Sequence, residues 1–276
     1  MSVFYNELFT DHYKDYIQKF WTLDNSGNPF YTEPKFALPN GCCTIAFISG
    51  NGITLNFPHQ TVELPSGIFL AGQITHRTSV AVKPDTKAVM AQVKPWLPLL
   101  ITNFPMNRLV NDVLSLEHIN LNLYQNLLNV NHASPEVIAT ILCKKLEAYL
   151  TADPDCKLIQ WVFQKLQEKG SNGQNRILDV VERSGYSQRR MEQKFKQLVG
   201  PSAKEIQRIL QLRKLINDLD QLESPAHLSR LAYQHGYYDQ SHFIRSYQQI
   251  ISGAPSLFDA SDYLLPKSGH FDFLQS

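Results

Sequence analysis

Arginine and glutamine side chains recur at helical spacing in the segment SQRRMEQKFKQLV, residues 187–199. A guanidinium group and a carboxamide group each carry two neighbouring hydrogen-bonding positions, which match the edges of guanine and adenine in the major groove of DNA. A solvated helix face has the same composition, so this segment alone fits both a DNA-reading helix and an ordinary exposed helix. The predicted outward face consists of Arg189, Gln193, Lys196 and Gln197, with Arg190 beside them.

The residues around this face predict a helix-turn-helix unit. A short apolar helix would be followed by the turn Ser184-Gly185-Tyr186, and Ser187 would cap the second helix. A short turn that contains glycine sets two helices at a steep angle. Apolar residues at helical spacing predict a buried stripe on each helix. The residues expected to face inward are Ile177, Val180 and Val181 in the first helix, and Met191, Phe195 and Leu198 in the second.

A second copy of this pattern lies between residues 227 and 251, where the Gly185-Tyr186 pair recurs as Gly236-Tyr237. A connecting helix is predicted from about Ala203 to Leu219, with enough apolar residues to pack against both units. Two reading helices joined rigidly would enter successive major grooves, about 34 Å apart. In this copy we expect Phe243, Tyr247 and Ile250 to face inward, and Ser241, Arg245, Gln248 and Gln249 to face outward.

The repetition of the motif favours DNA reading over simple solvation of the two faces. Aromatic and imidazole side chains near the turns are expected to pack or to cap helices rather than to read bases. These residues are Tyr186, Tyr237, Tyr238 and His242.

Overall charge gives little indication of a polyanionic partner, because the formal net charge is only +1 and the isoelectric point is about 7.7. Positive charge is concentrated locally instead. Residues 174–201 hold six basic and three acidic side chains, whereas residues 202–260 hold six of each. We therefore expect attraction to phosphates to come mainly from the first unit.

The N-terminal half reads as short apolar segments between turn residues, over about residues 34–93. The turn Ser49-Gly50-Asn51-Gly52 predicts a hairpin, since Asn-Gly readily adopts positive φ angles. Beyond Pro105 the pattern becomes helical, and Ser134-Pro135-Glu136 predicts a helix that runs to about Leu150. Its apolar face fits core packing, which we favour, or a dimer seam. Strands are predicted at residues 44–48, 53–57, 68–71 and 88–93.

The segment Thr151-Ala152-Asp153-Pro154 interrupts the helical pattern, and we place a domain boundary near residue 152. A further helix with apolar residues between Leu158 and Leu166 follows, and then Gly170-Ser171-Asn172-Gly173 ends it. The predicted division is a sensory, effector-binding or dimerisation domain at residues 1–151, a DNA-binding domain at 152–265, and a loose tail at 266–276.

Other kinds of site lack support in the sequence. No segment indicates export or a membrane span, so we expect a soluble protein of the reducing cytoplasm. Histidines such as His12, His59 and His76 lack metal-ligand spacing, and no nucleophile elbow or glycine-rich phosphate loop occurs, so neither a metal, a cofactor nor catalysis is predicted. The four cysteines are expected to be core residues rather than redox sensors: Cys42, Cys43, Cys143 and Cys156.

Two long segments resemble a known family. SGYSQRRMEQKFKQLVGPSAKEI and LAYQHGYYDQSHFIRSYQQIISGAP are similar to the DNA-binding domain of the bacterial AraC/XylS-type transcription regulators, over roughly residues 155–260. LPNGCCTIAFISG and KPWLPLLITNFPMNRLVND resemble the cupin-like sensory domain that often precedes it. The resemblance implies base-reading positions at Arg189, Glu192 and Gln193 in the first reading helix, and at Gln240, Ser241 and Arg245 in the second.

The sequence departs from the family pattern at three positions. Ala203 stands where proline is usual, and Tyr247 replaces the commoner phenylalanine. Ser252 stands where glycine is usual, with Gly253 one position later, which predicts a slightly re-aimed end of the second reading helix.

Together these observations predict an α+β chain: a small antiparallel β-sheet or barrel with helices, then an all-α domain with two helix-turn-helix units. The predicted function is a sequence-specific, double-stranded DNA-binding transcription regulator modulated by its N-terminal domain. Its expected partners are promoter DNA, a small-molecule effector or a second copy of the chain, and RNA polymerase, with no membrane partner. The residues expected to contact DNA are Ser187, Arg189, Arg190, Glu192, Gln193 and Lys196 in the first unit, and Gln240, Ser241, Arg245 and Gln248 in the second.

The alternative is a helix-turn-helix adaptor, or a small-molecule-binding protein, that acts through protein contacts. Salt-dependent DNA binding distinguishes the two readings, because an adaptor would lack it.

Overall fold

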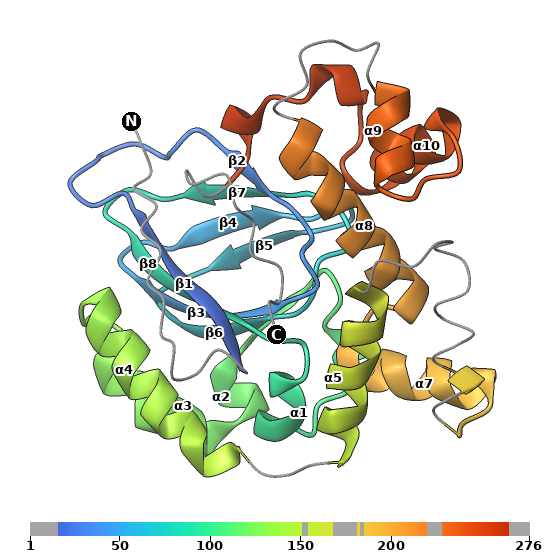
Figure 1. The fold of residues 1–276 in the computed structure, drawn as a ribbon. Coiled ribbons are helices and arrows are strands. Elements are labelled where there is room, and N and C mark those ends of the chain that lie inside the picture. The colour runs from blue at the N-terminus through green and yellow to red at the C-terminus, as the bar shows by residue number, and fades with distance from the viewer. Residues whose placement is uncertain (1–15, 151–153, 168–180, 183–184, 220–227, 265–276) are drawn as a thin grey trace.

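Two antiparallel sheets pack face to face in the N-terminal half of the chain (Figure 1). The structure is a computed structural model that describes residues 16–150, 154–167, 181–182, 185–219 and 228–264. One sheet has the strand order β1 (Ile17–Asp24), β8 (Lys87–Val93), β3 (Cys43–Ser49), β6 (Gly67–Ala71) and β9 (Val113–Ser115). The other has the order β2 (Lys35–Ala37), β7 (Thr78–Val82), β4 (Ile53–Asn56) and β5 (Thr61–Leu64).

Strand β3 shows why its sequence is almost wholly apolar. Successive side chains of a strand point to opposite faces of the sheet. Ile45 and Phe47 point toward the helices that cover the outer face, whereas Ala46 and Ile48 point toward the second sheet. Because all four side chains are buried, neither face of this strand can be polar.

Helices cover the outer face of the five-stranded sheet, and Figure 1 shows α2, α3 and α4 along this side. The predicted helix at residues 134–150 is confirmed as α4, which continues into a 3₁₀ turn. Ser134 caps it by accepting a hydrogen bond from the backbone N–H of Val137. The helical elements of this half are α1 (Leu97–Ile101), η2 (Met106–Arg108), α2 (Leu116–Ile119), α3 (Leu121–Leu127), η3 (Leu128–Val130), α4 (Pro135–Leu146) and η4 (Glu147–Tyr149).

The four strands predicted from the sequence are confirmed as β3, β4, β6 and β8, but the predicted hairpin is wrong. β3 pairs with β6 and β8, whereas β4 pairs with β5 and β7 in the other sheet. The glycine turn therefore carries the chain from one sheet to the other. Asn51 helps to fix this turn, because its side-chain amide donates a hydrogen bond to the carbonyl oxygen of Pro84 at 2.8 Å.

The described part of the C-terminal half is helical, apart from its turns and connecting segments. No helix among the described residues is both long and apolar enough to cross a membrane. The predicted connecting helix is confirmed with its predicted ends as α8. The elements are α5 (Pro154–Gln167), α7 (Gln188–Val199), α8 (Ala203–Leu219), α9 (Leu228–Gln234), α10 (Gln240–Ile250), η6 (Pro255–Leu257) and η7 (Ala260–Asp262).

All four cysteines are buried and unbridged, as predicted. Burial raises the pKa of the Cys42 thiol to about 11 and raises the pKa of Cys43 as well. Both side chains therefore stay protonated near neutral pH, which suits core packing better than thiolate chemistry. Among the described residues, no three histidine, cysteine, aspartate or glutamate side chains gather in a way that could hold a metal ion.

Substitution of Gly50 by alanine should destabilise the protein more than substitution of Gly27 by alanine. Both glycines have positive φ angles, 89° and 70°, so each change imposes a backbone cost of about 1–2 kcal/mol. A Cβ atom at Gly50 would also overlap the carbonyl oxygen of Asp85, whereas a Cβ atom at Gly27 meets nothing within 4 Å. Urea denaturation of both variants measures the difference, and equal losses of stability would contradict this packing of the turn.

Candidate nucleic-acid interface

The second helix of the first unit, α7, is built as the sequence predicts. Ser187 caps it, with its Oγ accepting a hydrogen bond from the Arg190 backbone N–H at 3.4 Å. Met191 and Phe195 are buried, and the Phe195 ring stacks on Phe163 of α5 with centroids 6.0 Å apart. Leu198 is only half-buried. The inward stripe of α7 is therefore confirmed, and it holds the helix against α5.

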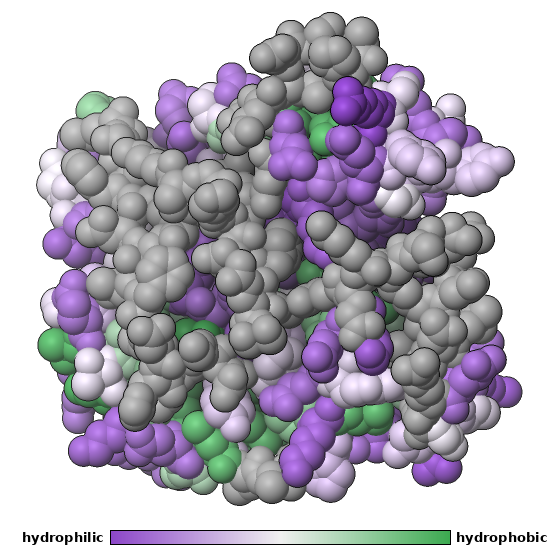
Figure 2. All heavy atoms as spheres, viewed as in Figure 1, coloured by the Kyte–Doolittle hydropathy of each residue, from purple (hydrophilic) through white to green (hydrophobic). Residues whose placement is uncertain are grey.

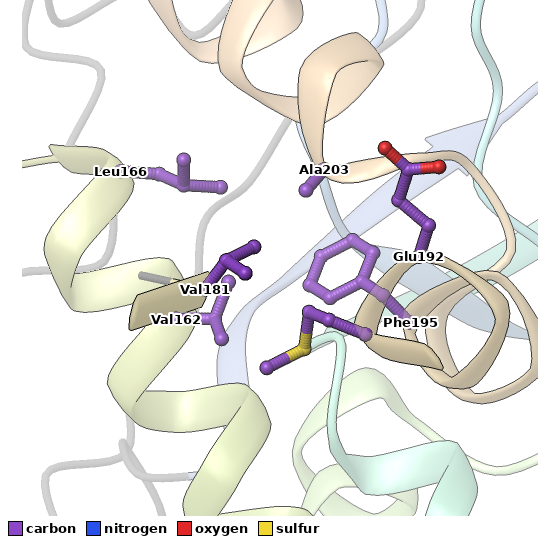
Figure 3. Close-up of a pocket in the computed structure, with 7 residues that line it drawn as sticks. Val162, Leu166, Val181, Glu192, Phe195 and Ala203 are labelled. Carbon is purple, nitrogen blue, oxygen red and sulfur yellow. The ribbon is translucent and has the colours of Figure 1, made fainter. Parts of the chain in front are cut away.

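A small pocket lies within this unit, between α5, residue 181, α7 and the start of α8 (Figure 3). Figure 3 shows Val162, Val181 and Phe195 converging on it, and the carboxylate of Glu192 at its rim. The predicted first helix of the unit lies largely outside the described residues, of which only 181 and 182 belong to it. The half-buried side chain of Val181 agrees with its predicted inward position.

The outer face of α7 is open to solvent. The guanidinium of Arg190 also lies over the ring of Tyr186, 5.2 Å from its centroid. Lys194 belongs to a different side of the helix, because its ammonium group pairs with Asp155 of α5 at 2.6 Å. The exposed residues of this face include Ser187, Arg189, Arg190, Glu192, Gln193 and Lys196. All six residues predicted to contact DNA in the first unit are thus accessible.

The second unit, α9 and α10, repeats this construction. Asp239 caps α10, with its Oδ1 accepting a hydrogen bond from the His242 backbone N–H at 2.7 Å. Phe243, Tyr247 and Ile250 are buried, as predicted, and Tyr237 packs edge-on against Phe243 with centroids 5.3 Å apart. Burial raises the pKa of Tyr237 to about 12, so its hydroxyl stays neutral.

The outer face of α10 is also exposed, and hydrogen bonds hold parts of it in place. Gln240 accepts a hydrogen bond from the Ser229 hydroxyl of α9 at 2.7 Å. Gln249 accepts one from the guanidinium of Arg208 on α8 at 2.8 Å. The residues of this face include Gln240, Ser241, Arg245 and Gln248, and all four are exposed.

Two expectations for this unit need correction or refinement. The sequence predicts that Tyr238 packs or caps a helix, but this residue is 88% exposed. Tyr237 faces inward and its neighbour in the sequence consequently points outward. Ser252 takes the left-handed conformation itself, with φ 63°, and Gly253 follows with φ 88°. The helix end thus retains its left-handed residue although that residue is not glycine.

Helix α8 connects the two units through their cores. Ile206 and Leu210 pack into the first core, whereas Ile209 and Leu215 pack into the second. In Figure 1, α8 runs between α7 and the α9–α10 pair, and in Figure 2 hydrophilic side chains gather over this part of the surface. The predicted role of this helix as a shared support is confirmed.

The N-terminal half contacts the first unit at its core and at the end of α7. The rings of Trp96 and Phe163 meet edge-on with centroids 6.2 Å apart. Gln73 donates a side-chain hydrogen bond to the carbonyl oxygen of Val199 at 3.3 Å. Gly200 lies so close to Met106 that an added Cβ atom would stand 3.1 Å from its carbonyl oxygen.

The N-terminal half contacts the second unit through the backbone N–H of Arg77, which donates to the Ile250 carbonyl at 2.8 Å, and through a C-terminal clasp, which we define as residues 258–264. Tyr263 forms a parallel bridge with Phe36 of β2, and the backbone N–H of Leu264 donates to the Phe36 carbonyl at 2.9 Å. Lys35 donates to the Ser261 carbonyl at 2.7 Å. Leu38, from the loop after β2, is buried in the core of the second unit. Each unit therefore has its own anchor on the N-terminal half.

Residues 180–261 match the family described as a helix-turn-helix domain, and residues 11–115 match the family described as Domain of unknown function (DUF6597). Residues 180–261 are accordingly a helix-turn-helix domain, and the predicted resemblance to AraC/XylS-type regulators is confirmed. This assignment supports a DNA-binding transcription regulator, and points away from an enzyme.

Several solved structures are similar to the chain. ToxT from Vibrio cholerae is 16% identical over 86% of this chain and 96% of ToxT, with a TM-score of 0.45. ToxT with a bound unsaturated fatty acid is 13% identical over 83% and 94%, with a TM-score of 0.38. The AraC-like transcriptional activator CuxR is 12% identical over 72% of each chain, with a TM-score of 0.28. No curated protein matches the sequence.

Substitution of Asp239 by alanine should lower the free energy of unfolding by about 1 kcal/mol, because α10 loses the side chain that caps its first turn. Substitution by asparagine keeps a capping oxygen and should cost only a few tenths. Urea denaturation of both variants measures this difference. An alanine variant as stable as the wild type would show that the cap contributes nothing.

Proposed function

We propose that α7 and α10 read promoter DNA in two successive major grooves, and that the protein regulates transcription from that position. The observation that carries this proposal is the pair of exposed polar faces on two helices that share one supporting helix, α8. Arg189 and Arg245 are suited to guanine, because a guanidinium group donates two parallel hydrogen bonds to the guanine edge. The other proposed contacts are Ser187, Arg190, Glu192, Gln193, Lys196, Gln240, Ser241 and Gln248.

The second candidate function is an adaptor that acts through protein contacts. The near-zero net charge of the second unit is the observation that favours it. A protein that uses this unit for protein contacts would not need phosphate attraction there. The helix-turn-helix assignment favours DNA, and we take RNA polymerase as a second proposed partner at the promoter. Loss of DNA affinity as salt rises is the behaviour that the DNA-binding proposal requires.

We further propose that the N-terminal half, up to about residue 152, modulates DNA binding in response to a small effector or a second copy of the chain. Two separate anchors support this proposal: Gly200 against Met106 for the first unit, and Tyr263 against Phe36 for the second. Because α8 packs into both cores, it can align the two units without help from the N-terminal half. The two anchors therefore restrain the units in addition to α8. An event in the N-terminal half that shifts either anchor would alter how the reading helices meet DNA.

Substitution of Arg189 or Arg245 by alanine should each cost about 1–3 kcal/mol of discrimination between the preferred DNA and a single-base variant. Competition binding with the full chain measures this discrimination. Lys144 is an exposed cation on α4, remote from both faces in sequence, and its substitution by alanine is the matched control. Equal losses on preferred and random DNA would instead show that the arginine contacts phosphate.

Substitution of Tyr263 by alanine should raise DNA affinity about fivefold or more, because it removes the aromatic contact that anchors the second unit. Titration of labelled DNA with the full chain measures the affinity. Hydrogen exchange at the Leu264 amide shows whether the clasp has opened. An opened clasp with unchanged affinity would refute the proposed restraint.

A further inference from the structure

Two tyrosine rings of the second unit project into solvent beside its reading helix. Tyr233 and Tyr238 are 77% and 88% exposed. No described residue forms a hydrogen bond with either hydroxyl. Their neighbour Tyr237 is buried in the core of the unit, so core packing accounts for Tyr237 but not for the two exposed tyrosines.

The hydrogen bonds of the unit place both rings near the N-terminal end of α10. The Ser229 hydroxyl donates to Gln240 at 2.7 Å, which sets the exposed side of α9 beside the first turn of α10. Tyr233 lies four residues after Ser229 and so shares its side of α9. Tyr238 directly precedes the cap residue Asp239. The two rings thus flank the N-terminal end of α10, which is the end that would enter the major groove first.

In a helix-turn-helix unit the start of the second helix approaches base edges, while the first helix crosses the phosphate backbone. Side chains on α9 and just before α10 are therefore in position to meet phosphates. Tyrosine hydroxyls are among the groups that donate hydrogen bonds to phosphate oxygens. This position suits a neutral donor on an exposed, rigid ring.

The charges of the second unit make such neutral donors useful. Arg230 and Arg245 are its exposed cations among the described residues of α9 and α10, whereas Asp239 is an exposed anion between them. His235 at the end of α9 pairs with Asp218 of α8 at 2.8 Å. In the first unit α7 alone presents three exposed cations, Arg189, Arg190 and Lys196, so charge can contribute more to phosphate attachment there than in the second unit.

We propose that Tyr233 and Tyr238 donate hydroxyl hydrogen bonds to the DNA backbone, and so attach the second unit with little help from charge. This inference rests on the proposed function, because it needs α10 to enter DNA. Attachment through these two hydroxyls is insensitive to salt and to base sequence, whereas attachment through the exposed cations of α7 depends on salt.

The test uses the full chain with substitutions of Tyr233 and Tyr238 by phenylalanine, singly and together, and DNA selected by the wild type. Each variant keeps its exposed ring and loses one hydroxyl. Each hydroxyl lost should weaken binding about two- to tenfold, by the same factor on selected and on scrambled DNA. The slope of log affinity against log salt should not change, because no charge is removed.

Two comparison variants distinguish the loss of a hydroxyl from the loss of a charge and from a change far from the DNA. Substitution of Arg230 by glutamine removes an exposed cation on the same side of α9 and should reduce the salt slope by about 1 if it contacts phosphate. Substitution of Tyr31 by phenylalanine alters a 58% exposed tyrosine in the N-terminal half and should leave DNA affinity unchanged.

Unchanged affinity in the double phenylalanine variant would overturn the inference. A loss confined to the selected DNA would also overturn it, since that result would mark the hydroxyls as base readers. A changed oligomeric state in the double variant, measured by sedimentation, would assign the rings to a protein contact instead. A folded wild type that binds no DNA would overturn the proposed function itself, before any tyrosine variant is compared.

Discussion

The C-terminal half depends on the apolar packing of α8 against the cores of both helix-turn-helix units. A helix that contributes Ile206 and Leu210 to one core and Ile209 and Leu215 to another cannot move without disturbing both. Burial of each such side chain contributes about 1.5–3 kcal/mol, so the two units are held together by a large apolar contact rather than by a flexible linker. Two exposed faces that are fixed in this way keep a constant relative position, as the proposed double reading of DNA requires.

The N-terminal half contributes side chains to the cores of both helix-turn-helix units. Trp96 completes the core around Phe163, and Leu38 enters the core around Tyr247. The clasp adds backbone pairing at the edge of β2. A change in the strand-rich half can therefore be transmitted through packed side chains to α7 and to α10, which is the physical basis for the proposed modulation.

The periodic spacing of apolar residues predicted the helices that bury only one face. The ends of α8 and the inward positions of Phe243 and Tyr247 follow from spacing alone. Contacts made by loop residues such as Leu38 have no periodic signal, and the anchors between the halves were accordingly not foreseen. The hairpin prediction was wrong because turn chemistry fixes the local bend but not the sheet that the next strand joins. Exposure of Tyr238 was missed because an aromatic residue is usually packed.

The proposed function requires that the two units read one stretch of DNA together. Selection of genomic DNA fragments by the full chain, followed by sequencing, tests it most directly. If the two units read DNA together, the enriched motif should contain two half-sites about one helical turn apart. A single half-site, or no enriched motif from a chain shown by circular dichroism to be folded, would contradict double reading by α7 and α10.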